Sequence, residues 1–393
     1  MDAVEGLLLA LAAASAALYL TMVAGFLLAM RRRGPSRMPQ QGPRVSILKP
    51  LAGMDDELAE NLSSFATLEY PDYELVLGVA SIDDQAYPVA RRFVERVGPR
   101  LARLVVTDPD AAINPKVAQL LALERAATGD IVVVSDSNVR VTPGYLDALV
   151  AELSAPGVAA VSSIVAGTGE RTLGATLENL QLGAIIAPGI VASASITGWG
   201  ITVGKSMAMW REPLRRIGGF SHVAHVLSDD HMLARAFTQA GYRVRVSLWP
   251  VDNRNVSCSL GRTIERHTRW AKIRRVMKPA GFVLEPTLSP VVITTLACLA
   301  VPTKLLCLAL LVAVALQTTC ATVTLGTLRG GTPRWYVAPL EILRSYLLFF
   351  CWLRACASRR VSWRGHDFVL GRDSVIVPAE PSAWHRVLAM VRA

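Results

Sequence analysis

The stretch IVVVSDSN, residues 131–138, decides the fold class of this 393-residue chain. Its run of β-branched residues is typical of a strand that is buried on both faces. Similar apolar runs at 45–48, 73–80 and 101–106 alternate with helix-like stretches at 55–64, 86–96 and 116–127. This alternation predicts an α/β domain with a parallel sheet that helices cover on both faces.

Acidic residues follow two of these strands. Asp83 and Asp84 come after the run 73–80, and Asp136 comes directly after Ser135. A lone acid after a strand is more often a turn or cap residue. Two such strand ends together favour a ligand site, because α/β sheets bind ligands at the carboxyl ends of their strands. We expect Asp136 to hold a divalent cation, Mg²⁺ or Mn²⁺, together with substrate phosphates.

A second acidic group opens a predicted helix at 229–239, where Asp229 and Asp230 precede His231. Carboxylates at a helix N-terminus can be simple caps, whereas a carboxylate that points into a cleft can deprotonate an attacking hydroxyl. His231 is a candidate metal ligand, although a lone histidine is more often structural. The sequence leaves these alternatives open.

A basic group begins at Arg266, just before the C-terminal apolar region. Arg266 and Arg269 share one face of a predicted helix, and Trp270 follows them. Guanidinium groups suit the negative charge of a diphosphate leaving group. The alternative is a basic helix on the membrane surface, and both interpretations hold if they use different faces.

The N-terminal segment predicts a membrane anchor. Residues 7–30 contain no charge and as a helix would span about 36 Å, enough to cross a bilayer core. Arg31, Arg32 and Arg33 follow directly, which by the positive-inside rule places the N-terminus outside and the next domain in the cytoplasm. A cleaved signal peptide would instead carry basic residues before a shorter apolar core.

The C-terminal third is also apolar. Residues 288–328 fit two spans joined by a turn near Pro302, and 336–356 either spans or lies on the surface as an amphipathic helix. The expected parts are an N-terminal anchor (1–33), a cytosolic domain (45–285), C-terminal membrane segments (286–356) and a basic cytosolic tail (357–393).

Composition agrees with a membrane protein. The hydrophobic fraction is 52%, the mean hydropathy is +0.37 and the net charge is +10. A positive charge suits nucleic acid, anionic lipid head groups or a diphosphate substrate. Because apolar spans are present, we favour the membrane and the diphosphate and expect no nucleic-acid partner.

The order of the motifs resembles the ceramide glucosyltransferases, and the chain is identified as a bacterial member of that family. The matching stretches are VSILKPLAG (45–53), NL (61–62), YPDYE (70–74), DD (83–84), INPKV (113–117), SDSNVRV (135–141), DD (229–230) and RHTRW (266–270). They cover most of the domain. The resemblance implies a GT-A fold, in which helices flank a mixed sheet, with transmembrane helices at both ends of the chain.

The resemblance implies donor-binding roles. Asp83 and Asp84 match the aspartates on the uridine side of the donor, Lys116 matches a donor-binding lysine, and Asp136 matches the aspartate that binds the metal and the diphosphate. Asn138 is a departure, because a full Asp-x-Asp motif would carry a second acid there. The expected metal site then has one carboxylate fewer than a site with the full motif.

The resemblance also implies catalytic roles. Asp230 matches the catalytic base, and Arg266, Arg269 and Trp270 match a motif near the leaving diphosphate and the acceptor. Asp229 stands where the acidic pair often begins with Glu, a departure that we expect to matter little.

The implied activity is inverting transfer of a hexose, glucose in this family, from a UDP-sugar to ceramide by a multi-pass protein of the inner membrane whose catalytic domain faces the cytoplasm. Alternative acceptors are a hopanoid polyol or diacylglycerol. A processive polysaccharide synthase would have more spans, and a non-catalytic scaffold would not need the intact motifs. The apolar segment 172–194 either delivers the lipid at the membrane interface or is a buried core helix.

Overall fold

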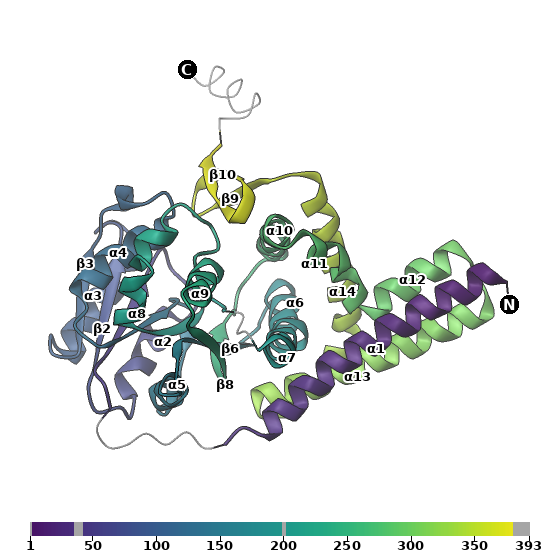
Figure 1. Cartoon of the computed structure of the whole chain (residues 1–393), viewed down its shortest axis with the longest axis horizontal. Helices are drawn as coiled ribbons and strands as arrows, with labels where there is room; N and C mark the ends of the chain where they lie inside the picture. Colours follow the sequence, from purple (N-terminus) through teal and green to yellow (C-terminus); the bar gives the residue numbers. More distant parts are fainter. Residues whose placement is uncertain (1, 35–41, 199–201, 380–393) are drawn as a thin grey trace.

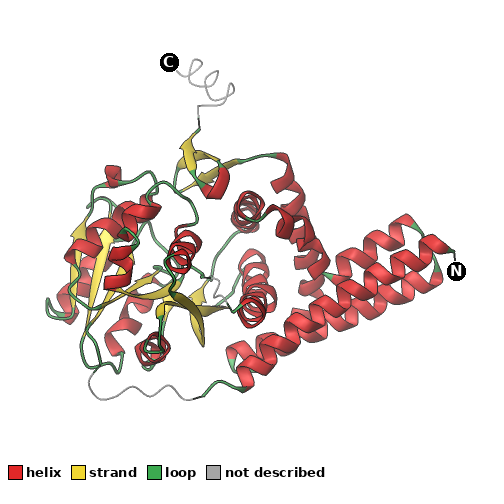
Figure 2. Cartoon of the chain, in the orientation of Figure 1, coloured by secondary structure: helices red, strands yellow, loops and turns green. Residues whose placement is uncertain are grey.

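The computed structural model describes residues 2–34, 42–198 and 202–379. Within these residues, an α/β domain carries a group of long helices that projects from one side, with the N-terminus at the far end (Figure 1). Helices lie on both sides of the central sheet (Figure 2).

The central sheet is mixed. Its eight strands follow the order β3-β2-β1-β4-β7-β6-β8-β5. The first four in this order are parallel, whereas β7 pairs antiparallel with β4 and with β6. The strands are β1 (Val45–Pro50), β2 (Tyr73–Val79), β3 (Ala102–Val106), β4 (Ile131–Ser135), β5 (Val139–Arg140), β6 (Val158–Thr168), β7 (Ser206–Trp210) and β8 (Arg243–Arg254). The predicted GT-A-like α/β fold is confirmed, and the predicted parallel pairing holds for β1 to β4.

Successive residues of the buried strands serve opposite faces. Ile47 packs into the apolar core on one face of β1, and Leu48 packs into the core on the other. Helices cover both faces, as the apolar runs without alternation predicted. These helices are α2 (Leu58–Ser64), α3 (Tyr87–Val97), α4 (Pro115–Ala126), α5 (Tyr145–Leu153), α8 (Arg211–Arg216) and α9 (Asp229–Gln239).

The projecting group contains α1 (Ala3–Arg31), α12 (Pro290–Ala300) and α13 (Lys304–Arg329), which pack against one another (Figure 1). By length and composition, three helical segments of the described residues could cross a membrane: α1, Leu173–Ile196 and α13. The second of the two spans predicted in 288–328 corresponds to the candidate α13. The first stays a prediction, since α12 has 11 residues and alone reaches only about 16 Å. It forms a bent pair with Pro279–Leu288, at 80°.

Residues 337–356 of the stretch 336–356 lie in one helix, α14 (Val337–Ala357). It is not among the three candidate spans of the described residues and packs against α10 (Leu260–Met277) and α13. Glu341 and Arg344 form a buried ion pair on it, and the Gln317 amide of α13 donates to Glu341 at 2.9 Å. These polar contacts attach α14 to its neighbours.

The segment 172–194 forms two helices joined by a π-helical turn at Leu182–Ile186. All of α6 (Leu173–Gln181) apart from its first residue is buried, which agrees with a core helix. Helix α7 (Ala187–Thr197) packs against α1, where Val191 and Phe26 share a core, but Ile196 near its end is 77% exposed. Delivery of a lipid by this segment stays a hypothesis.

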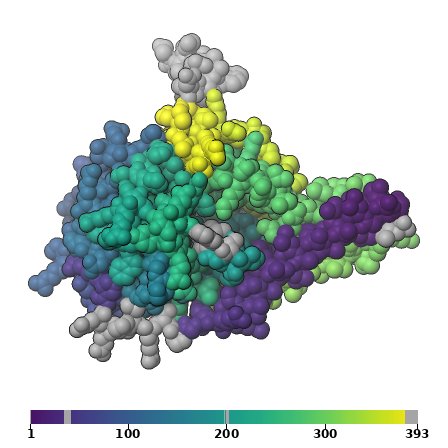
Figure 3. All heavy atoms as spheres, viewed as in Figure 1, coloured from purple at the N-terminus to yellow at the C-terminus, as the bar shows by residue number. Residues whose placement is uncertain are grey.

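Part of the predicted tail is folded. Strands β9 (Arg360–Trp363), β10 (His366–Leu370) and β11 (Ile376–Pro378) form an antiparallel sheet. This sheet covers the region just before α9, where the Leu227 N–H donates to the Ser374 carbonyl oxygen at 2.9 Å (Figure 3, yellow). Residues 380–393 of the tail lie outside the described residues.

Candidate active site

The carboxyl end of β4 positions Asp136. β4 lies beside β1, which lies beside β2, and all three are parallel. The segments that carry Asp84 and Asp136 therefore leave the sheet at the same edge. The Asp136 N–H donates to the Lys205 carbonyl oxygen at 3.2 Å, which continues the β4–β7 ladder by one residue.

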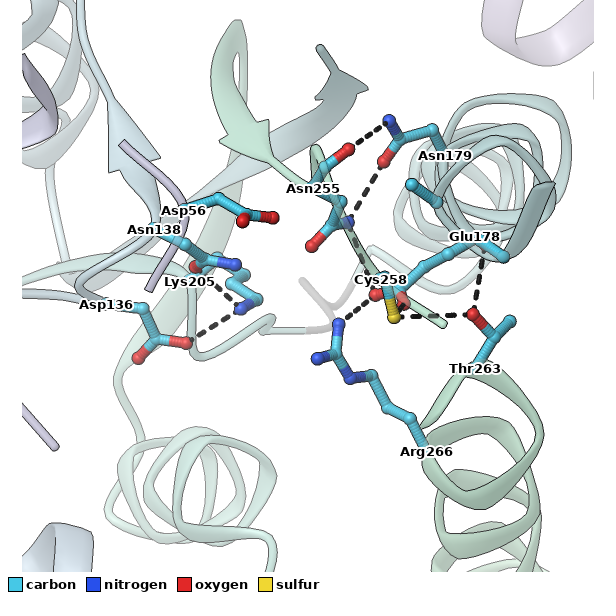
Figure 4. Close-up of polar contacts among 12 residues, drawn as sticks. Asp56, Asp136, Asn138, Glu178, Asn179, Lys205, Asn255, Cys258, Thr263 and Arg266 are labelled. Carbon is cyan, nitrogen blue, oxygen red and sulfur yellow. Dashed lines mark hydrogen bonds and ion pairs between the residues drawn. The ribbon is translucent and has the colours of Figure 1, made fainter. Parts of the chain in front are cut away.

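Three lysines surround Asp136. Lys116 Nζ lies 3.2 Å from Oδ1, Lys205 Nζ lies 3.1 Å from Oδ2, and Lys49 Nζ donates to the backbone oxygen at 2.9 Å. Burial alone would raise the pKa of the Asp136 carboxyl, but Lys116 and Lys205 hold it far below its usual value. Asp136 is therefore ionised, with an ammonium group on each oxygen (Figure 4 shows the Lys205 pair).

Lys116 links two of the acidic motifs. It lies in the first turn of α4, where the Asn114 side chain caps the helix by accepting the Lys116 N–H at 2.9 Å. Its ammonium group also lies 3.4 Å from Asp229 Oδ2. Burial would lower the pKa of Lys116, but Asp136, Asp229 and Asp230 outweigh burial and raise it. A charged lysine thus connects the end of β4 with the start of α9.

Asp230 is held in one orientation by neighbouring groups. Its Oδ2 accepts the Gly204 N–H at 2.7 Å, and its Oδ1 accepts the Ser228 hydroxyl at 3.0 Å and the His231 N–H at 2.7 Å. Burial and the nearby Asp230 carboxylate raise the pKa of Asp229. The two acids therefore differ: Asp229 pairs with a lysine, and Asp230 is oriented by backbone N–H groups and a hydroxyl.

Asp83 and Asp84 lie at the end of β2 but differ in their surroundings. Asp84 Oδ1 accepts the Gly53 N–H at 2.9 Å and the Ala86 N–H at 2.8 Å, so it joins the loop after β1 to the turn before α3. Asp83 is exposed and contacts the Ser81 hydroxyl at 3.4 Å. Neither forms an ion pair within the described residues. The Asp83 carboxylate therefore has fewer contacts within the protein than the Asp84 carboxylate.

Arg266 is bound by an acid that sequence reasoning did not identify. It forms an ion pair with Glu178 of α6, whose side chain is 1% exposed. Glu178 also accepts the Asn255 amide at 3.3 Å, and the Cys258 thiol lies beside it. Figure 4 draws this group on the helix side of the region, across from Lys205 and Asp136.

Arg269 and Trp270 complete the predicted basic motif. Arg269 donates to the Ser362 carbonyl oxygen at 3.5 Å, and burial, together with Arg266 and Arg364, lowers the pKa of Arg269 to about 10. Trp270 contacts His267 edge to face and packs against the main core. Arg364 comes from the turn between β9 and β10, so the C-terminal sheet contributes charge near this motif.

Three residues of the site were missed by sequence reasoning, and two of them carried a signal. Lys49 is the only charged residue of a strand that is otherwise apolar or small, and Glu178 is the only charge in the apolar segment 172–194. Lys205 precedes β7, a strand that the sequence analysis did not predict. Burying a charge without a partner costs free energy. A charged residue inside an apolar run therefore predicts an ion-pair or hydrogen-bond partner elsewhere in the fold.

The residues present fit a divalent cation through one carboxylate. Among the described residues, no group of three or more His, Cys, Asp or Glu side chains could hold a metal ion. Asn138 Oδ1 accepts the Lys205 ammonium at 3.0 Å. Because magnesium often binds through one carboxylate together with substrate phosphates and water, Asp136 suits a cation that arrives with a diphosphate.

Comparisons with known proteins agree with the motif order. The model of glycosyl transferase family 21 matches residues 7–376. Ceramide glucosyltransferase 3 of Caenorhabditis elegans is 29% identical over 245 residues, which are 62% of this chain and 53% of that protein. Ceramide glucosyltransferase 1 of the same organism is also 29% identical, over 62% of this chain and 52% of that protein. The match thus spans about half the length of these relatives.

A solved structure was also found to be similar. The mannosyltransferase PcManGT from Pyrobaculum calidifontis, in complex with GDP-Man and Mn²⁺, is 20% identical, with a TM-score of 0.48 over 88% of this chain and 99% of that chain.

Proposed function

The chain belongs to glycosyl transferase family 21, and from this premise we propose that it transfers a hexose, glucose by family default, from a UDP-sugar to ceramide with inversion. The observation that carries the proposal is one connected polar network. Lys116 contacts both Asp136 and Asp229, and the adjacent residues Gly204 and Lys205 contact Asp230 and Asp136. The acids proposed for the donor phosphates and for the base are therefore neighbours.

In the proposed reaction, Asp230 removes the proton from the lipid hydroxyl. The hydroxyl oxygen then forms a bond to the anomeric carbon while the bond from that carbon to UDP breaks, which inverts the configuration. The three hydrogen bonds to Asp230 would keep its carboxylate in one orientation during this step. Asp229 would keep Lys116 in place rather than act as the base.

Positive groups would stabilise the leaving diphosphate. Lys116 and Lys205 lie on the sheet side, and Arg266 and Arg269 lie on α10. A divalent cation held by Asp136 would add positive charge at the same phosphates. Asp83 and Asp84 would contact the uridine. Since Arg31 ends α1, we propose that the domain lies on the cytoplasmic side of the membrane.

The test uses membranes that contain the full chain. We would incubate them with ceramide and a panel of UDP-sugars, with Mg²⁺ or Mn²⁺ or with a chelator, and detect glycolipids by mass spectrometry. We expect a glycosylceramide whose formation falls by about 10²–10⁴-fold in Asp230→Asn, the range that a general base contributes. Asp110→Asn, at an exposed site, is the matched control and should keep full activity.

Other outcomes would change the proposal in defined ways. Product with a hopanoid or diacylglycerol, but none with ceramide, would replace the acceptor and keep the reaction type. No product with any lipid, together with no binding of UDP, would support a non-catalytic scaffold and overturn the proposal.

A further inference from the structure

Lysines are concentrated around Asp136. The chain contains 41 lysines and arginines, and six of these are lysines, at positions 49, 116, 205, 272, 278 and 304. The first three of these place their ammonium groups on Asp136 or on its backbone oxygen. The described cationic groups bonded to Asp136 are therefore all ammonium groups, which are compact point charges rather than planar forks.

The pairing of β4 with β7 places Lys205 opposite Asp136. Ser135 pairs with Ser206 in the antiparallel β4–β7 ladder, and the Asp136 N–H donates to the Lys205 carbonyl oxygen. Residues that oppose each other in such a ladder project to the same face, with Cβ atoms about 5 Å apart. The Lys205 side chain is 17% exposed, so it is close to the carboxylate and still reachable by a ligand.

The ammonium group of Lys205 bridges the two ends of the motif at 136–138. It lies 3.1 Å from Asp136 Oδ2 and 3.0 Å from Asn138 Oδ1. The three side chains together have no net charge. A motif with two acids and no lysine would carry two negative charges and would repel a diphosphate until a divalent cation neutralised them. Here the chain supplies positive charge of its own at that position.

We propose that Lys205 is a built-in cation of the donor site, which binds the diphosphate directly and makes nucleotide binding largely independent of divalent cations. This inference rests on the UDP-sugar donor proposed above. Lys205 contacts phosphate oxygens when the nucleotide is bound, and Asp136 retains Lys116 on its other oxygen. A divalent cation still assists, but the nucleotide does not require it in order to bind.

The experiment measures UDP binding rather than turnover. Purified full-length protein in detergent is titrated with UDP by calorimetry, once with EDTA and once with excess Mg²⁺. For the wild type, we expect the two dissociation constants to differ by less than about tenfold. For Lys205→Met, we expect binding in EDTA to weaken by more than about tenfold, with a smaller loss in Mg²⁺.

Two further variants separate charge from fold. Lys205→Arg keeps the positive charge and should bind UDP in EDTA, whereas Lys304→Met removes an exposed lysine at the start of α13 and should change nothing. If the wild type binds UDP in Mg²⁺ but not in EDTA, the inference is wrong and the proposed function stands. If UDP binds in neither condition, both are wrong. The wild-type titration decides this even if Lys205→Met does not fold.

Discussion

The sheet side and the helix side of the site arrange charge in different ways. Asp136, at the end of β4, has an ammonium group on each carboxylate oxygen. The Glu178 side chain, on α6, is 1% exposed. Among the described residues, its ion-pair partner is Arg266 alone. A carboxylate with two cationic partners can release one of them to a ligand. A buried carboxylate with one partner cannot do so without leaving a charge unpaired. Arg266 therefore stays paired with Glu178, whereas Lys205 can turn from Asp136 to a ligand.

The largest expected effect is on the free energy of unfolding, which should differ between variants of the two sides. Glu178→Ala should lower the free energy of unfolding by about 3 kcal/mol, because it removes the ion-pair partner of Arg266, a guanidinium that is 22% exposed. Asp136→Asn should lower it by less, because Lys116 then keeps Asp229 as a partner and Lys205 keeps Asn138 Oδ1. Denaturant unfolding of the protein in detergent gives both values.

Glu178→Gln is the matched control for the helix side. Its amide oxygen can still accept a hydrogen bond from Arg266. The decrease in its free energy of unfolding should therefore lie between the decreases of the other two variants. Equal losses for Glu178→Ala and Asp136→Asn would show that the two sides do not differ in the way described.

A smaller effect concerns the geometry of the sheet side. A Cβ added at Gly204 would lie 3.1 Å from Lys116 Nζ and 3.3 Å from Asp230 Oδ2. Gly204→Ala should therefore displace both groups slightly and lower kcat by about tenfold or more, with little loss of stability. Gly144→Ala is the control, since its added Cβ meets no atom within 4 Å, and it should keep the wild-type rate. Wild-type kinetics in Gly204→Ala would argue that the network tolerates displacement.

The smallest expected effect is a dependence of stability on pH. Burial lowers the pKa of Lys49 from 10.5 to about 7. Above pH 7 the folded protein then binds fewer protons at Lys49 than the unfolded chain does, so stability should rise with pH between 7 and 10.5. Between pH 7 and 8 this gain should be about 1 kcal/mol.

Lys49→Met provides the comparison for this titration, because it lacks the ammonium group and should lose the gain. The pH dependence of unfolding, measured for both proteins, checks the expectation. Identical slopes would show that Lys49 keeps an ordinary pKa inside the sheet.

Much of the sheet could be predicted, because runs of apolar, β-branched residues indicate buried strands. The runs that begin at Val45, Tyr73 and Ile131 each form a strand that begins at that residue, and the helix predicted at 229–239 has those bounds. Strand β7 was missed, since SMAMW contains no β-branched residue and lies after a glycine-rich stretch. The bend before α12 was not predicted, because hydropathy counts apolar residues but does not show that the chain turns near Ser289 and Pro290.

The sequence by itself determined the strand ends, and with them the acids at Asp84, Asp136 and Asp230, because local hydrophobic patterning and helix capping depend on neighbours in the chain. Only the tertiary structure decided which charge meets which. Lys205 reaches Asp136 through the register of β7, and Glu178 reaches Arg266 because α6 packs against α10. Pairings between residues far apart in sequence follow from the packing of whole elements, which no local pattern of residues contains.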